Sequence, residues 1–340
     1  MPTTRALALK TIALLFALTT IASAQDYPSK PVRVIIPFPP GGINDTVGRL
    51  VATQLSTRLG KQFIVENRGG AGGIVAGELV ANAPKDGHTL MVVSLAITVL
   101  PAMHTLPYDT LKSFAPVAVV ATAPNVAVVN QDLPVKSIKE LIALAKERPG
   151  KLQYASSGVG TFLHLGPELF KLMAGVDILH VPFRGAGPAL IDVIGGHTHM
   201  AFASVPSVIA HLRSGKLRAL GVGATERYAL IPDVPTISES GLPGYAAANW
   251  IGIVAPGGTP QPIIAKLHQE ISAIQDSPEA QKQFANEGAD IIRMTSAPSC
   301  ANVFCISSVS WTAEISLWSL VTMASGVPAG ATMPIQFAAA

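Results

Sequence analysis

The stretch VRVIIPFPPGGINDTVGRL, residues 32–50, contains the three parts from which the fold is built. The β-branched run of residues 32–36 predicts a strand, and residues 37–42, rich in proline and glycine, break it. Asn44 or Asp45 can cap a following helix. In that helix apolar residues recur at helical spacing: Val47, Leu50, Val51, Leu55 and Leu59. The stretch therefore predicts a strand, a stiff turn and an amphipathic helix.

The same unit recurs along the chain, which predicts an α/β protein with mostly parallel sheets covered by helices. Ser137 and Glu140 form a capping box, and Thr259 with Pro260 marks another helix start. The further expected elements are strand 62–66, helix 74–83, strand 152–156 and a helix carrying Leu165, Leu169, Leu172 and Met173. No repeat of solenoid length interrupts this alternation.

The N-terminus predicts export. Arg5 and Lys10 precede the uncharged apolar residues 11–22, and Ala22-Ser23-Ala24 has the small-x-small pattern of a cleavage site. The apolar run is shorter than the ~20 residues that span a bilayer. We therefore expect residues 1–24 to be a signal peptide, cleaved near Ala24, and the mature protein to reside in the periplasm.

Composition limits the partners. Hydrophobic residues make up 49% of the chain, which is enough for a large core, and the formal net charge is only +3. Nucleic-acid binding requires a concentrated basic face, so we exclude it. The two cysteines, Cys300 and Cys305, have no partner pair, which argues against zinc and leaves a local disulfide open. We expect neither a metal nor a cofactor.

Two turns have the chemistry of an anion site. Residues 37–45 and residues 156–161 each follow a strand and precede a helix, and both are rich in glycine. Free amides and the helix dipole favour a carboxylate or phosphate at such a place. His164 follows one turn inside the second helix. Two such turns facing each other predict a binding cleft.

Other interpretations of these residues remain open. A glycine-rich turn can be only a tight connection, Asp45 suits a helix cap as well as a ligand contact, and a helical histidine such as His164 is commonly structural. The sequence gives less support to an enzyme than to a binding protein. The first turn lacks the ending of a nucleotide P-loop, and Ser156 and Ser157 lie in no nucleophile elbow. We therefore expect a binding protein and not an enzyme.

Several blocks of sequence resemble the substrate-binding proteins of tripartite tricarboxylate transporters, the Bug or TctC-like family. The blocks occur in the family's order over roughly residues 26–293. They are PFPPGGINDTVGR (37–49), VENRGGAGG (65–73), PKDGHTL (84–90), PGKLQYASSGVGTFLHL (149–165), HVPFRGAGPAL (180–190), GKLRAL (215–220), PDVPTISESGLPGY (232–245) and APGGTP (255–260).

The resemblance implies a two-lobed type II periplasmic-binding-protein fold with a ligand cleft between the lobes. Residues 26–124 and 246–293 would form lobe 1, and residues 125–245 lobe 2. Carried over from the family, the ligand-binding residues would be Phe38, Gly41, Gly42 and Asp45 on lobe 1, and Ser156, Ser157, Gly158, Gly160, Thr161 and His164 on lobe 2. Arg184 and Ser204 would border the cleft.

The resemblance also implies a function. A monomeric receptor would capture a small carboxylate (a di- or tricarboxylate, an aromatic acid or an amino acid) and deliver it to membrane permease subunits. An input protein for a two-component sensory system would use the same binding residues, so this alternative stays open. An α/β enzyme would require turnover, for which the sequence shows no activated nucleophile and no acid–base pair.

The C-terminal segment departs from the family pattern. After Arg293 the only charged side chain is Glu314, and Ser, Ala, Val and Met fill much of residues 294–340. Family members end in a charged amphipathic helix on lobe 1. We interpret residues 294–340 as an atypical tail, of the kind that a frameshifted reading frame produces.

Overall fold

The computed structural model describes residues 27–292. The expected signal peptide and the atypical tail, with Cys300 and Cys305, lie outside these residues. Among the helices of residues 27–292, none combines the length and the apolar character that crossing a membrane requires.

The described chain alternates strands and helices. The strands are β1 (Val32–Ile36), β2 (Phe63–Asn67), β3 (Thr89–Ser94), β4 (Phe114–Asn130), β5 (Gln153–Ser156), β6 (Leu179–Pro182), β7 (Met200–Ser204), β8 (Leu217–Val222), β9 (Ala248–Pro256) and β10 (Asp290–Ile291). The helices are α2 (Ile43–Leu59), α3 (Ile74–Ala81), α4 (Ala96–Met103), α5 (Ile138–Glu147), α6 (Phe162–Ala174), α7 (Ala186–Ile194), α8 (Val205–Arg213), α9 (Gln261–Asp276) and α10 (Pro278–Asn286), with a 3-10 turn at η1 (Ala71–Gly73).

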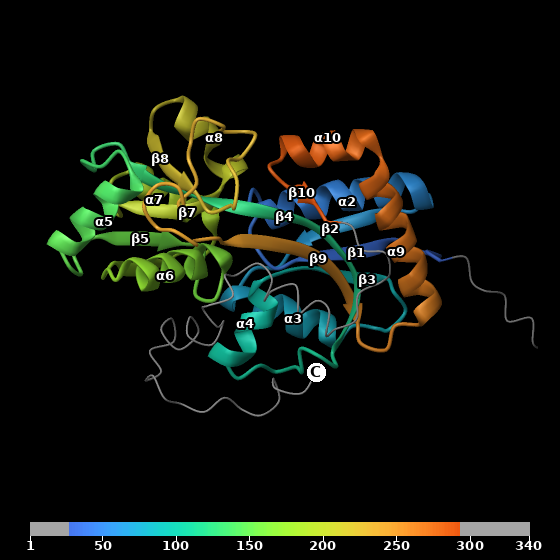
Figure 1. Ribbon diagram of the computed structural model, residues 1–340. Helices are drawn as coiled ribbons and strands as arrows, with labels where there is room; N and C mark the ends of the chain where they lie inside the picture. The colour runs from blue at the N-terminus through green and yellow to red at the C-terminus, as the bar shows by residue number, and fades with distance from the viewer. Residues whose placement is uncertain (1–26, 293–340) are drawn as a thin grey trace, which may run out of the picture.

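The strands form two groups that share β4 (Figure 1). In the first group, here called the β1 half, the order is β2-β1-β3-β9-β4, and β10 also pairs with β4. In the second, the β5 half, the order is β4-β7-β5-β6, and β8 also pairs with β4. The outer pairs are parallel, as expected, but every pair made by β4 or β9 is antiparallel. The sheet is therefore mixed, with its antiparallel part at the centre.

The chain passes between the halves at two neighbouring places. Along β4, Pro124 pairs with Ala248 of β9, and the next residue, Asn125, pairs with Ser204 of β7. The return passage lies beside it, because the Ala247 N–H donates to the Gly223 carbonyl and the Gly223 N–H donates to the Asn125 carbonyl. One strand thus belongs to both halves, and the second passage is hydrogen-bonded close to it.

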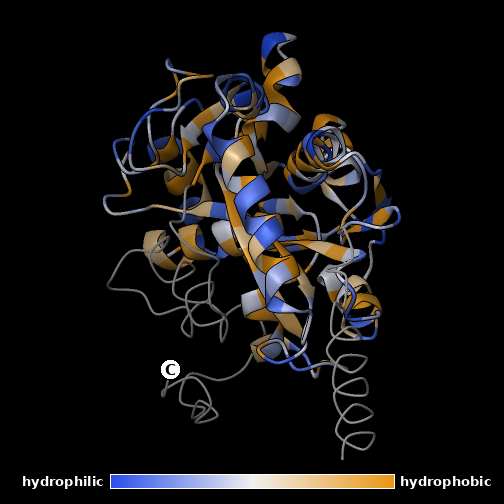
Figure 2. Cartoon of the chain, turned by 90° about the vertical axis from the view of Figure 1, so that its right-hand side faces the viewer, coloured by the Kyte–Doolittle hydropathy of each residue, from blue (hydrophilic) through white to orange (hydrophobic). Residues whose placement is uncertain are grey.

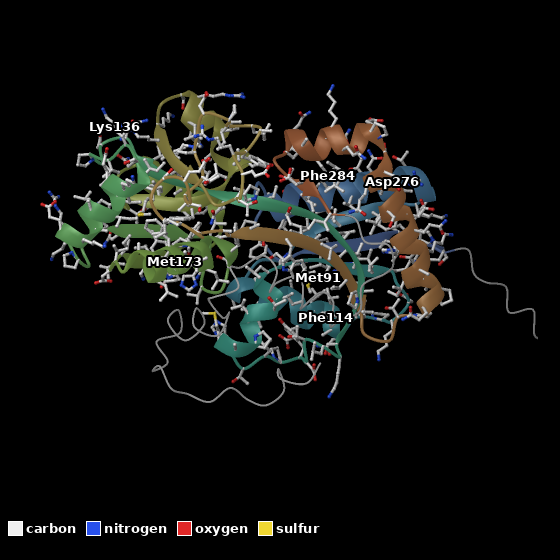
Figure 3. The ribbon with its side chains drawn as sticks, in the orientation of Figure 1. Met91, Phe114, Lys136, Met173, Asp276 and Phe284 are labelled. Carbon is white, nitrogen blue, oxygen red and sulfur yellow. The ribbon has the colours of Figure 1, made fainter. Side chains whose placement is uncertain are left out.

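Helices cover the sheet on both sides, which explains the continuous apolar runs of the central strands. The long strand β4 is almost entirely buried. Figure 2 looks onto the side that carries α9 and shows polar and apolar residues alternating along the covering helices. In Figure 3, Met91 on β3 and Met173 on α6 lie in the two different halves.

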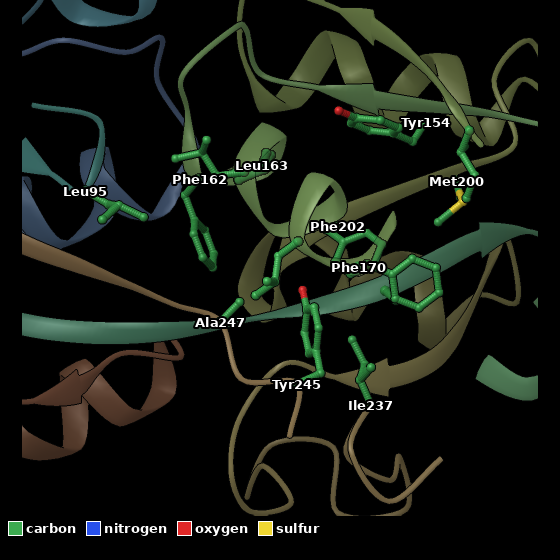
Figure 4. Close-up of a cluster of buried hydrophobic side chains, with 14 of the residues drawn as sticks. Leu95, Tyr154, Phe162, Leu163, Phe170, Met200, Phe202, Ile237, Tyr245 and Ala247 are labelled. Atoms are coloured by element: carbon green, nitrogen blue, oxygen red, sulfur yellow. The ribbon is translucent and has the colours of Figure 1, made fainter. Parts of the chain in front are cut away.

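One cluster of buried apolar side chains extends across both halves. Leu95, next to α4, lies toward Phe162 at the start of α6, and Phe202 and Tyr245 continue the cluster into the β5 half (Figure 4). The two halves are therefore in apolar contact near the start of α6.

Two helix starts differ from the sequence prediction. Gly42, and not Asn44 or Asp45, is the N-cap of α2, and it offers no side-chain cap. Pro260, and not Thr259, is the N-cap of α9. The predicted cap at Ser137 is confirmed, since its hydroxyl accepts the Glu140 N–H.

Candidate ligand-binding cleft

A cavity of about 50 Å³ lies between the two halves, where the β1–α2 loop meets the β5–α6 turn. The lining residues come from both halves and are polar, apolar or glycine. They are Phe38, Pro39, Pro40, Gly42, Ile43, Asn44, Ser94, Ser157, Thr161, Phe162, Leu163, Gly185, Ala186, Ser204 and Asn249. A wider groove of about 610 Å³ adjoins the cavity and shares Phe38, Pro39, Ser157 and Gly185 with it.

Helix N-termini supply the donors of this cavity. At the start of α2, the N–H groups of Ile43 and Asn44 have no acceptor among the described residues, and at the start of α6 the same holds for Phe162 and Leu163. The starts of α7, at Ala186, and of α8, at Ser204, also border the cavity. The free N–H groups and the helix dipoles make this cavity suited to an anion. No Lys, Arg, Asp or Glu is among its described lining residues, so charged side chains do not contribute.

A charged network holds the β1–α2 loop. The Asp45 carboxylate, nearly buried, accepts the Gly41 N–H at 3.1 Å, both of its oxygens lie 3.0 Å from the Arg49 Nε, and Oδ1 accepts the Asn67 amide at 2.7 Å. The same amide donates to the Phe38 carbonyl at 2.9 Å. Burial raises the pKa of Asp45, but these hydrogen bonds outweigh it and hold the pKa below its usual value. The carboxylate therefore fixes the loop from within.

Neutral groups hold the β5–α6 turn. The Thr161 hydroxyl donates to the Gly158 carbonyl at 2.7 Å and accepts the Ser157 hydroxyl at 3.0 Å. The Ser156 hydroxyl accepts the Gly158 N–H at 3.1 Å and lies 2.6 Å from the His180 Nε2. The turn is thus shaped by its own hydroxyl groups and by one imidazole beneath it.

Two histidines are stacked behind this turn. The rings of His164 and His180 have centroids 4.1 Å apart, and the Tyr154 ring stacks against His180 at 4.8 Å. The His164 Nδ1 accepts the Gly160 N–H at 3.1 Å, which requires that this nitrogen carry no proton. Burial, together with Lys171, lowers the pKa of His164 to about 4. Burial and the neighbouring His164 lower that of His180 to about 3. Both rings are therefore neutral at pH 7.

The expected site residues fall into three groups. Five line the cavity: Phe38, Gly42, Ser157, Thr161 and Ser204. Two line only the adjoining groove: Gly158 and Arg184. The other five lie in or behind the two turns and line neither space: Gly41, Asp45, Ser156, Gly160 and His164.

Three polar residues of the cavity were not expected as ligand contacts. Asn44 was considered only as a cap, and Ser94 and Asn249 lie in other elements, β3 and β9. The Asn249 amide lies 3.4 Å from the Asn44 side-chain oxygen, and both residues are buried. Their common location depends on strand pairing far along the chain, for which the sequence carries no local signal.

The halves touch at the rim of the cleft through glycines. A Cβ on Gly72 would lie 2.9 Å from the Val159 carbonyl oxygen, and a Cβ on Gly185 would lie 2.8 Å from the Pro39 Cγ. Each pair joins one half to the other. The absence of side chains at these two positions therefore permits the two halves to approach this closely.

Comparisons with known proteins show the family of this chain. Residues 47–303 match the family model described as the tripartite tricarboxylate transporter family receptor. Protein BugT of Bordetella pertussis is 38% identical over 270 residues, which cover 78% of this chain and 83% of that protein. A protein from the tcbD-tcbE intergenic region of Pseudomonas sp. strain P51 is 41% identical over 262 residues, which cover 76% of this chain and 78% of that one.

Solved structures of periplasmic binding proteins share the fold. Rpa4515 of R. palustris, solved with adipate, is 34% identical with a TM-score of 0.80, over 88% of this chain and 98% of that one. MatC of Rhodopseudomonas palustris, solved with bound malate, is 31% identical with a TM-score of 0.76, over 88% and 99%. The expected α/β periplasmic-binding-protein fold and a binding role without catalysis are confirmed, and the chain belongs to the tripartite tricarboxylate transporter receptor family, TctC.

Proposed function

We propose that this chain is a periplasmic receptor that captures a small carboxylate in the cleft and delivers it to the membrane permease subunits of a tripartite transporter. The observation that carries the proposal is the cavity between the free N–H groups of α2 and α6. A carboxylate there accepts from both helix N-termini, and the hydroxyls of Ser157, Thr161 and Ser204 supply further donors. The relatives solved with adipate and malate support this ligand class.

Capture would proceed by closure of two lobes, residues 27–124 with 246–292 and residues 125–245. The two adjacent passages, at Pro124–Asn125 and at Ala247, are the only places where the described chain crosses from one lobe to the other, and they suit a hinge. A ligand that accepts from α2 on one lobe and from α6 on the other stabilises the closed form over the open one.

Family and sequence support the proposed compartment and partner. The family is one of transport receptors, and the N-terminal residues 1–24 have the pattern of a cleaved signal peptide. The mature protein would thus be a periplasmic monomer whose closed form is recognised by the permease.

A binding experiment with a blocked cavity tests the carboxylate site. Gly42 has an ordinary φ of −89°, and a Cβ there meets no atom within 4 Å. The position has room for a Cβ, so we expect Gly42→Val to fold and to place a side chain at the cavity wall. A carboxylate at a hundredfold over its Kd adds about 2.7 kcal/mol to the unfolding free energy of the native protein. We expect adipate or malate to raise the Tm of the native protein and not that of Gly42→Val.

Gly187→Ala is the control, because Gly187 also has open space and no positive φ but does not line the cavity. It should keep the ligand-induced rise in Tm. A native protein that melts cooperatively and shows no shift with any di- or tricarboxylate, aromatic acid or amino acid would refute the proposed function.

A further inference from the structure

The cavity is too small to contain a whole ligand of the proposed class. An apolar cavity of about 150 Å³ is known to accommodate one benzene ring, and this cavity measures about 50 Å³. It has room for a carboxylate group and little more. Since the proposed function places a carboxylate there, the rest of the ligand must lie outside the cavity.

The adjoining groove lies directly beside this cavity. The two spaces share walls from both halves, Phe38 and Pro39 on one side and Ser157 and Gly185 on the other. At about 610 Å³ the groove has the volume of an ordinary small-molecule site. Much of its wall is Pro, Gly and Phe, which suits the methylene groups of an extended ligand.

Among the described residues that line this groove, Arg184 is the single one with a charged side chain. It is exposed, and no ion pair or hydrogen bond to another described residue occupies its guanidinium. It directly precedes Gly185, the N-cap of α7 and part of the wall shared with the cavity. The Arg184 guanidinium therefore lines the groove, next to a cavity whose described lining residues include no charged side chain.

We infer that the groove is a second anion subsite and that Arg184 selects extended ligands with two anionic ends, such as α,ω-dicarboxylates. The first carboxylate accepts from the N-termini of α2 and α6, the methylene chain lies along Phe38 and Ser157, which line both spaces, and the second carboxylate pairs with the guanidinium. An exposed arginine is screened by solvent, so its contribution is moderate and depends on salt. The inference rests on the proposed function, because it requires the first carboxylate in the cavity.

Calorimetric titration of the full chain with adipate and with monomethyl adipate tests this assignment. The half-ester keeps the length and one carboxylate but loses the second charge. We expect the native protein to bind adipate roughly twofold to fivefold more tightly than the half-ester, the size expected for one exposed charge pair. Arg184→Gln should remove this preference and leave the affinity for the half-ester within about twofold.

Arg213→Gln is the matched control, because Arg213 is also an exposed arginine of the β5 half but does not line the groove. It should keep the preference for adipate. The preference in the native protein should also shrink as salt rises from about 0.02 M to about 0.5 M.

Three results would overturn the inference. If the native protein binds both acids equally, or if Arg184→Gln weakens both by the same factor, the second subsite is wrong while the carboxylate cavity stands. If the native protein binds neither of these acids nor any other carboxylate, the proposed function fails and the inference fails with it.

Discussion

The two turns that form the cleft present a helix N-terminus in the same way but are supported by opposite chemistry. Behind the β1–α2 loop lies an ionised carboxylate, Asp45, paired with Arg49. Behind the β5–α6 turn lie two neutral imidazoles, His164 and His180, in van der Waals contact. Both turns thus present N–H groups to an anion, but one turn is supported by charged side chains and the other by neutral ones.

This difference indicates that the two turns respond differently to their surroundings. The pKa of Asp45 is lowered, so its network stays charged throughout the neutral and mildly acidic range. The pKa values of His164 and His180 are also lowered, so the folded protein holds both rings neutral. Acid therefore favours the unfolded chain, in which the two histidines take up protons more easily. The first turn should be sensitive to loss of a residue, and the second to pH.

The largest effect is expected from Asp45→Ala. The substitution leaves the Gly41 N–H, the Asn67 amide and the Arg49 guanidinium without their shared acceptor. We expect a loss of about 3 kcal/mol in the free energy of unfolding and weaker binding of adipate, because the loop loses its shape. Chemical denaturation measures the first effect and calorimetry the second.

Asp45→Asn is the control for shape, since its one amide oxygen can keep the hydrogen bond from either Gly41 or Asn67, which donate to different oxygens of the carboxylate. It should lose less stability than Asp45→Ala. Equal losses in the two variants would show that the charge, and not the hydrogen-bonded shape, is what the loop requires.

A smaller effect is expected on acidification. The folded pKa of His164, about 4, lies below the unfolded value of about 6.5, so the unfolded chain binds more protons between these values. This stability is fully present above about pH 6.5 and is lost as the pH falls, by about 1.4 kcal/mol per pH unit for one such histidine. His164 alone should account for a loss of ~2 kcal/mol by about pH 5, measured by denaturation across the range.

His164→Asn sharpens this test, because the asparagine side chain offers an oxygen to the Gly160 N–H but cannot titrate. Its stability should depend less steeply on pH than that of the native protein. An unchanged slope would assign the acid sensitivity to other groups.

The smallest effect is expected from Thr161→Val, which preserves the size of the side chain and removes its hydroxyl. The hydrogen bonds to the Gly158 carbonyl and from the Ser157 hydroxyl are lost, at a cost of about 1 kcal/mol. Thr161→Ser should restore most of the stability. If Thr161→Ser is as unstable as Thr161→Val in denaturant titrations, the methyl group and not the hydroxyl supports the turn.

Local features of the fold could be predicted from the sequence. β1 occupies residues 32–36 as expected, because a β-branched run followed by prolines decides that strand locally. The helix start was wrong, since Gly42 is the N-cap and Asp45 is directed at Arg49 and Asn67. Asn67 is 22 residues away, and only the parallel pairing of β1 with β2 brings it to the loop.

Non-local features could not be predicted. The antiparallel centre arises because β9, after residue 247, returns between β3 and β4. The same return brings Asn249 beside Asn44 at the cavity. His180 was expected only as part of a sequence block, yet pairing of β5 with β6 places its ring under Ser156. The predicted assignment of ligand contacts stays a prediction, which the variants above test.

The absence of charged side chains from the cavity wall has a consequence for the transport cycle. Amide N–H groups can donate to water as well as to a carboxylate, whereas a buried ammonium without a counter-ion would resist closure. A receptor with a neutral wall therefore closes on solvent at little cost. Closed receptors without ligand would then compete with loaded ones for the transporter. When the ligand is scarce, a high concentration of receptor would therefore slow uptake.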